Sequence, residues 1–256
     1  HDETLMSHLL DLDEANKNEQ RIAMRTLALF QPFDFDDANS KIAQYLIHND
    51  LFTPIETQVN RDILFRKVVD KLSRRNLIDK DSVYISLRPT PLACWLVGEW
   101  LHDQGLQLLN IFTDLASHDK AFYSPIIETW ARRLSYMQDN PDAKELYAEL
   151  TKLNGGPFAS EDVLCSDFGS RLILAMCTVN PVAIVDCLYE ILFPMPVEKL
   201  RERLQGDARR NIVMTLERLC FCKDSFHKAA CLTARLALAE NESWANNSRG
   251  QFLQLF

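Results

Sequence analysis

The chain has 256 residues, of which 47% are hydrophobic and 25% charged, and its formal net charge is −8. This composition fits a soluble globular protein of one large or two ordinary domains. No apolar run approaches the roughly 18 residues that cross a bilayer, and no signal-peptide pattern opens the chain, so we expect a cytoplasmic protein. Its 7 glycines allow few turns with positive φ, which favours helices over a sheet-rich fold.

The charge is unevenly distributed along the chain. Residues 1–38 carry nine acids and three bases, residues 39–90 carry nine bases and six acids, and residues 91–256 carry 21 acids and 16 bases. Phosphate neutralisation by Lys and Arg supplies most non-specific affinity for nucleic acids. Only the middle block is therefore suited to a polyanion.

The N-terminal part begins with a polar, acidic segment, residues 1–20, which we expect to be partly ordered at best. Apolar positions predict a helix over residues 21–30, ended by Pro32. The stretch FDFDDANS, residues 33–40, reads as a loop that ends in the cap of a second helix. A third helix follows Asn60 and has an apolar row at Leu64, Val68 and Leu72.

A short β element is predicted after the third helix. Residues 79–82 have the composition of a turn, and residues 83–87 alternate as an edge strand does before Pro89. Three helices followed by one β wing indicate a winged-helix-like domain over residues 21–89.

Everything after Pro89 reads as helix. Thr90-Pro91, Ser124-Pro125 and Asn180-Pro181 each place a small polar cap before a first-turn proline, which is a common helix start. The predicted helices span residues 91–103, 106–117, 125–137, 142–153, 168–179, 181–193, 196–205, 207–222 and 225–240. The fold class is thus mainly α, and residues 90–256 are expected to form an irregular HEAT-like array of antiparallel helices. The apolar close of the chain, GQFLQLF, leads us to expect that this array is truncated.

Two sequence motifs carry a resemblance to a known family. Leu87 to Leu101 reads LRPTPLACWLVGEWL, and residues 236–256 read LALAENESWANNSRGQFLQLF. Together with the helix before them, they resemble the region after the nucleotide-binding core in large bacterial signal-transduction ATPases of the STAND class, over Arg21 to Phe256. The resemblance implies an upstream P-loop core, a winged helix that helps to hold that core inactive, and a helical arm that senses a partner.

The resemblance also implies two candidate nucleotide contacts. Winged-helix histidines of such ATPases often reach the bound nucleotide, and Leu101-His102-Asp103 is similar to that short motif. His48 is the second candidate, although a solvated or capping role is the simpler interpretation of both histidines. The chain has no G-x-x-x-x-G-K-[ST] loop, so we expect no ATPase activity and no cofactor in this chain.

A basic stripe on the third helix supports an alternative function. Opposite the apolar row lie the nucleic-acid or docking candidates Arg66, Lys67, Lys71, Arg74 and Arg75. A recognition helix displays phosphate and base contacts at such positions. Asp62 and Asp70 share the helix, so we favour a solvated or domain-docking face over DNA contact.

Other chemical readings are weaker. Asp34, Asp36 and Asp37 resemble the start of a calcium loop but lack its glycine and later glutamate. Cys220 and Cys222 point about 200° apart on a helix and cannot chelate one ion together. The acidic balance after residue 90 argues against a DNA-repair glycosylase on a HEAT-like scaffold. We therefore expect no metal site and no catalytic site, but a regulatory module that contacts an upstream nucleotide-binding domain or another protein.

Overall fold

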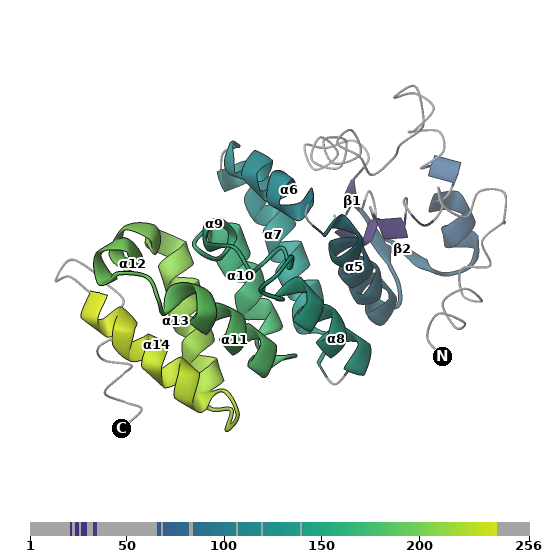
Figure 1. Cartoon of the computed structure of the whole chain (residues 1–256). Helices are drawn as coiled ribbons and strands as arrows, with labels where there is room; N and C mark the ends of the chain where they lie inside the picture. The colour runs from purple at the N-terminus through teal and green to yellow at the C-terminus, as the bar shows by residue number, and fades with distance from the viewer. Residues whose placement is uncertain are drawn as a thin grey trace. The chain divides into compact units, whose positions relative to one another are not determined.

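The computed structural model describes residues 21, 24–25, 27–29, 33–34, 66–67, 69–81, 84–105, 107–118, 120–138 and 140–239. The chain divides into two compact units, His1–Val97 and Gly98–Phe256. The fold is mainly α, as the sequence predicts, with one small sheet in the first unit (Figure 1). Among the helices described, none combines the length and the apolar character that a bilayer span requires.

The sheet of the first unit has three short antiparallel strands in the order β1-β3-β2. They are β1 (Phe33–Asp34), β2 (Ile78–Asp81) and β3 (Tyr84–Leu87). Ile85 and Leu87 are buried, while Ser86 between them is partly exposed, so the predicted alternation of this strand is confirmed.

Three predictions about the β structure are wrong. Phe33 and Asp34 pair with Ile85 and Tyr84 instead of lying in a loop. Residues 79–81 form most of strand β2 instead of a turn, and β3 is the central strand, not an edge. Asp and Lys have low strand propensity, but backbone pairing with β3 overrides that preference.

The basic helix lies between β1 and β2 in the chain. Residues 66–67 and 69–74 are helical, and Val69 and Leu72 are buried, which confirms the apolar face where it is described. The helix ends because the Leu77 amide donates to the Leu72 carbonyl at 3.0 Å. Asn76 takes a φ of 59° there, a left-handed residue of the kind that closes helices.

Helix α5 (Thr90–Gln104) begins at the predicted Thr90-Pro91. The second unit continues through three groups of helices in sequence order. The first group is α6 (Gln107–Ala116), α7 (Lys120–Ser135) and α8 (Pro141–Leu150). The second is α9 (Glu161–Leu164), α10 (Asp167–Met176) and α11 (Pro181–Leu192). The third is α12 (Val197–Arg203), α13 (Gly206–Cys220) and α14 (Phe226–Ala239).

Equivalent helices of successive groups lie side by side. Helix α10 packs between α7 and α13, and α11 packs between α8 and α14 (Figure 1). The polar contacts recur at a similar spacing: 43 positions separate Glu128 from Arg171, and 42 separate Asp186 from Lys228. This recurrence agrees with the period of roughly 40 residues that HEAT-type arrays show. A HEAT-like classification stays a prediction.

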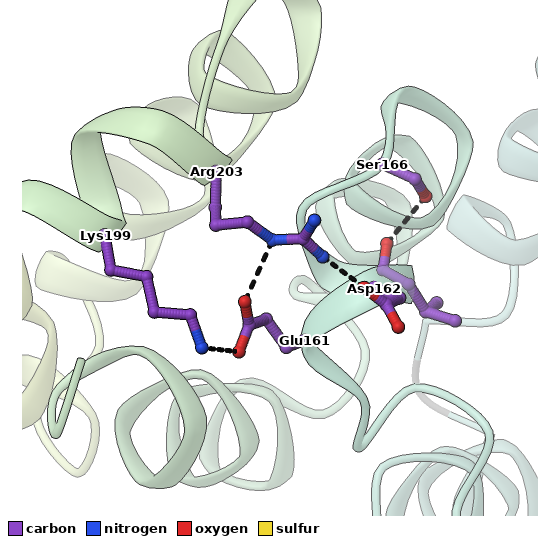
Figure 2. A network of polar contacts seen from close by, with 6 residues as sticks. Glu161, Asp162, Ser166, Lys199 and Arg203 are labelled. Atoms are coloured by element: carbon purple, nitrogen blue, oxygen red, sulfur yellow. Dashed lines mark hydrogen bonds and ion pairs between the residues drawn. The ribbon is translucent and has the colours of Figure 1, made fainter.

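The short helices α9 and α12 of successive groups are joined by ion pairs (Figure 2). Glu161 accepts a hydrogen bond from Lys199 at 2.6 Å, and its Oε1 forms an ion pair with Arg203, 2.9 Å from the Nε. Arg203 also pairs with Asp162. These contacts fix the relative positions of two groups of helices at the protein surface.

The helix starts show where local sequence decides structure. Asn180 accepts a hydrogen bond from the Ala183 amide at 3.1 Å, and Pro181 lies in the first turn, so this predicted cap is confirmed. The predicted start at Ser124-Pro125 is wrong, because α7 already begins at Lys120. Helix α9 was not predicted, since four residues are too few for a periodic signal.

Candidate functional site

Two neighbouring hollows lie over the layer formed by α7, α10 and α13. The first has a volume of about 250 Å³ and the second about 390 Å³. Both are lined by Glu128, Arg171 and Met214. We call the two hollows together the α10 groove, because α10 is the middle helix of this layer.

The first hollow is lined by charges of both signs. Lys120 from the start of α7 donates a hydrogen bond to Asp207 in the first turn of α13. This contact raises the pKa of Lys120 and lowers the pKa of Asp207. Each group is thus stabilised in its charged form. Tyr123 has a raised pKa because its phenol is partly desolvated.

Helices α10 and α13 are held together beneath this hollow. The Asp167 Oδ1 accepts from the Ala208 amide at 3.1 Å, near the start of α13, where an anion is favourable. The buried Asn211 Nδ2 donates to the Ser170 Oγ at 3.1 Å. These two hydrogen bonds position the helices. Asp167 and Asn211 therefore already have partners within the chain.

One ion pair lies where the two hollows meet. The Arg171 Nη2 donates to the Glu128 Oε2 at 2.8 Å, joining α10 to α7. The side chains keep 40% and 52% of their surface exposed, so water screens this pair. A screened pair of this kind contributes about 0–1 kcal/mol and is easily exchanged.

The second hollow is basic above an apolar floor. Its floor includes Ala131, Leu174 and Ala175, all buried. Arg132 and Arg218 join Arg171 at its rim, against the single carboxylate Glu128. Arg218 Nη1 makes a 3.4 Å bond to the Leu174 carbonyl.

Three arginines of the groove have no ion pair within the described residues. They are the exposed Arg132, Arg210 and Arg218; Arg210 lines the first hollow, and the other two line the second. The lining of both hollows carries five bases (Lys120, Arg132, Arg171, Arg210 and Arg218) and three acids (Glu128, Asp167 and Asp207). The groove therefore has an excess of positive charge on a chain whose net charge is −8.

The residues singled out from the sequence lie elsewhere. Arg66, Lys67 and Arg74 are exposed, whereas Lys71 and Arg75 are partly buried and Arg75 lies in the turn after the helix. His102 is exposed in the last turn of α5. His48 lies outside the described residues. None of these residues lines either hollow.

The structure describes only some residues of the calcium-loop and cysteine candidates that the sequence disfavours. Asp34 belongs to β1, and Asp36 and Asp37 lie outside the described residues. Cys220 is buried at the end of α13 and Cys222 follows it. Within the described ranges, no three His, Cys, Asp or Glu side chains gather as a metal site would require.

The groove was missed at the sequence level because its members come from three helices far apart in the chain. Each charge alone resembles a solvated helix position. The signal that the sequence does contain is the recurrence of arginine about one helix group apart, at Arg132, Arg171 and Arg210. Comparisons with protein-family models, curated proteins and solved structures give no match for this chain.

Proposed function

We propose that the chain is a non-enzymatic regulatory module of a larger bacterial cytoplasmic ATPase, and that it acts by binding another protein in the α10 groove. The observation that carries the binding role is the pair of adjoining hollows on one helix layer. Stacked helix groups offer extended surfaces for partners. The parent ATPase rests on the sequence motifs at residues 87–101 and 236–256.

The chemistry of the groove favours binding over catalysis. A general acid or base works best with a pKa near the operating pH. The pKa of Lys120 is raised and the pKa of Asp207 is lowered, so both pKa values move away from neutral pH. Both groups consequently act as fixed charges, which suits recognition.

A steric block tests this proposal directly. Ser124 is exposed and lines the first hollow, and the partly exposed Ser135 lines the second. The full chain is used as bait for a phage-displayed library of random linear peptides. We expect the selected peptides to lose binding to the Ser124→Trp/Ser135→Trp variant and to keep it with Ala116→Trp, a change at an exposed site on α6 that lines neither hollow. Selected peptides that bind the blocked variant as well as the parent would place recognition elsewhere.

The second candidate function is DNA contact through the basic helix. It is supported by the exposed Arg66, Lys67 and Arg74, but Asp70 is exposed on the same helix and opposes it. We expect weak binding to duplex DNA at physiological salt. A sub-micromolar, salt-sensitive mobility shift that disappears in the Lys71→Glu/Arg74→Glu/Arg75→Glu variant would reverse the order of the two candidates.

A further inference from the structure

We propose that the ligand of the α10 groove is an acidic linear peptide, whose carboxylates pair with Arg132, Arg171 and Arg218 while an apolar side chain covers the floor of the second hollow. This inference rests on the proposed function and gives the chemical class of its partner. The inference is supported by the basic side chains that surround apolar residues in the second hollow, on a chain whose net charge is −8.

The rim supplies the donors that carboxylates need. A guanidinium presents five N–H donors in a planar fork and pairs with carboxylates in a bidentate manner. Arg132 has no ion pair among the described residues. Arg218 bonds the Leu174 carbonyl at 3.4 Å and lies beside the Cys177 thiol, which leaves part of its five N–H donors unused. Both therefore keep donors for a ligand.

Arg171 becomes available by exchange of partner. Its internal partner Glu128 reaches it at 2.8 Å across the boundary of the two hollows. A ligand carboxylate can replace the Glu128 carboxylate at small cost, because exposed pairs contribute little. Glu128 then acts as an internal competitor, and its neutralisation should strengthen ligand binding.

The apolar floor selects peptide over simple anions. Ala131, Leu174 and Ala175 line a hollow of about 390 Å³, which has room for a side chain of the ligand. Covering this floor adds affinity roughly in proportion to the apolar area removed from water. A free phosphate or acetate gains nothing from it.

The distribution of the acids disfavours a nucleic-acid strand. Across both hollows, Glu128, Asp167 and Asp207 are interspersed with the bases and repel a regular row of phosphates. The second hollow, where we place the peptide carboxylates, is lined by one acid among the described residues, Glu128. Strands bound without sequence preference also stack on aromatic faces. None of the residues described at the second hollow is aromatic. In the first hollow, Phe168 is 5% exposed and meets Tyr123 edge-on with ring centroids 6.2 Å apart, so Phe168 offers no stacking face.

Peptides selected from the random library are synthesised with a fluorescein label, each beside a twin in which every Asp and Glu is amidated. Fluorescence anisotropy with the full chain then compares three variants with the parent protein. They are Glu128→Gln, the rim variant Arg132→Glu/Arg218→Glu, and the control Lys144→Glu/Lys223→Glu, which changes the net charge equally at exposed sites outside the groove.

We expect the selected peptides to be acidic, the amidated twins to bind about tenfold more weakly or worse, and the rim variant to lose binding by a similar factor. Glu128→Gln should bind severalfold more tightly, and the control should match the parent. Equal binding of acidic and amidated peptides, equal loss in the rim variant and the control, or no gain in Glu128→Gln would overturn the inference. A labelled single-stranded oligonucleotide that displaces the peptide with higher affinity would also overturn it.

The design separates this inference from the proposed function. Neutral or basic peptides that still depend on Ser124 and Ser135 would leave the groove as a binding site and remove only the acidic ligand. A library that yields no peptide for the full chain would remove both proposals.

Discussion

Trp100 of α5 and Trp130 of α7 lie against each other in the core of the second unit, with ring centroids 4.7 Å apart and planes at 56°. Both side chains are almost fully buried. Neither indole N–H has a hydrogen-bond partner within the described part of the chain. The pair thus combines a large apolar contact with two unsatisfied donors.

The first prediction concerns this pair. Trp130→Ala should lower the free energy of unfolding by about 3–5 kcal/mol, because it leaves a large cavity. Trp130→Phe should cost distinctly less, since it keeps an aromatic ring and removes a buried donor whose desolvation costs about 1–3 kcal/mol. Urea denaturation at unchanged m-value measures both. Equal losses for Phe and Ala would contradict both the stabilising ring contact with Trp100 and the unsatisfied indole N–H.

The sequence predicts the helical framework because apolar periodicity and capping are local properties. The Asn180-Pro181 start lies where predicted, since one side chain and one ring decide it. Phe33–Asp34 and residues 79–81 were mistaken for loop and turn because their strand pairing depends on β3. Non-local pairing of this kind leaves little trace in a single segment.

The candidate site could not be predicted from the sequence, for a related reason. Arg132, Arg171 and Arg218 meet only because α10 packs between α7 and α13. Along the chain they are separate charges on amphipathic helices, a pattern that is common on solvated faces. The basic stripe around Arg74, by contrast, lies on one helix and the turn that follows it, so the sequence alone reveals it.

The second prediction concerns the ion pairs between α9 and α12 (Figure 2). Arg203 contacts both Glu161 and Asp162, whereas Lys199 contacts only Glu161 among the carboxylates drawn. Arg203→Ala should therefore destabilise more than Lys199→Ala, each by about 1 kcal/mol or less. Added salt should shrink the difference.

A matched control for this network is Lys152→Ala. Lys152 pairs with Glu149 within one segment, at 3.4 Å, so it joins no two helix groups. Thermal denaturation at low and high salt compares the three variants. A loss in Lys152→Ala as large as that in Arg203→Ala would show that bridging α9 and α12 adds no stability.

The third prediction concerns Gly169 in the first turn of α10. A Cβ at this position would lie 2.0 Å from the Val163 carbonyl oxygen. This oxygen belongs to the backbone, so the clash can be relieved only by moving α9 or α10. Gly169→Ala should destabilise by about 3 kcal/mol through overpacking. Gly98→Ala is the control, because its nearest obstacle is the flexible Leu146 side chain at 2.9 Å, and helix propensity offsets about 1 kcal/mol. Similar unfolding midpoints for the two variants would contradict the close approach of α9 and α10.

The fourth prediction is a loss of stability at alkaline pH. Burial raises the pKa of Cys187 from 9.0 to about 12 and that of Cys165 to about 11. Above pH 9 the unfolded chain loses these thiol protons while the folded chain keeps them, so the free energy of unfolding must fall as pH rises. Each such thiol contributes a slope of up to about 1.4 kcal/mol per pH unit, until the folded thiol also ionises.

Cys187→Ala tests the contribution of one thiol. Cys187 is 1% exposed, and its Sγ lies 3.6 Å from the Phe158 carbonyl oxygen, so the variant is expected to start from a lower stability at neutral pH. Its stability should nevertheless fall less steeply than that of the parent above pH 9, because one proton no longer distinguishes the two states. Urea denaturation over a series of alkaline pH values gives both slopes. Parallel slopes would show that Cys187 ionises equally in the folded and unfolded chain, which would contradict its burial on the inner face of α11.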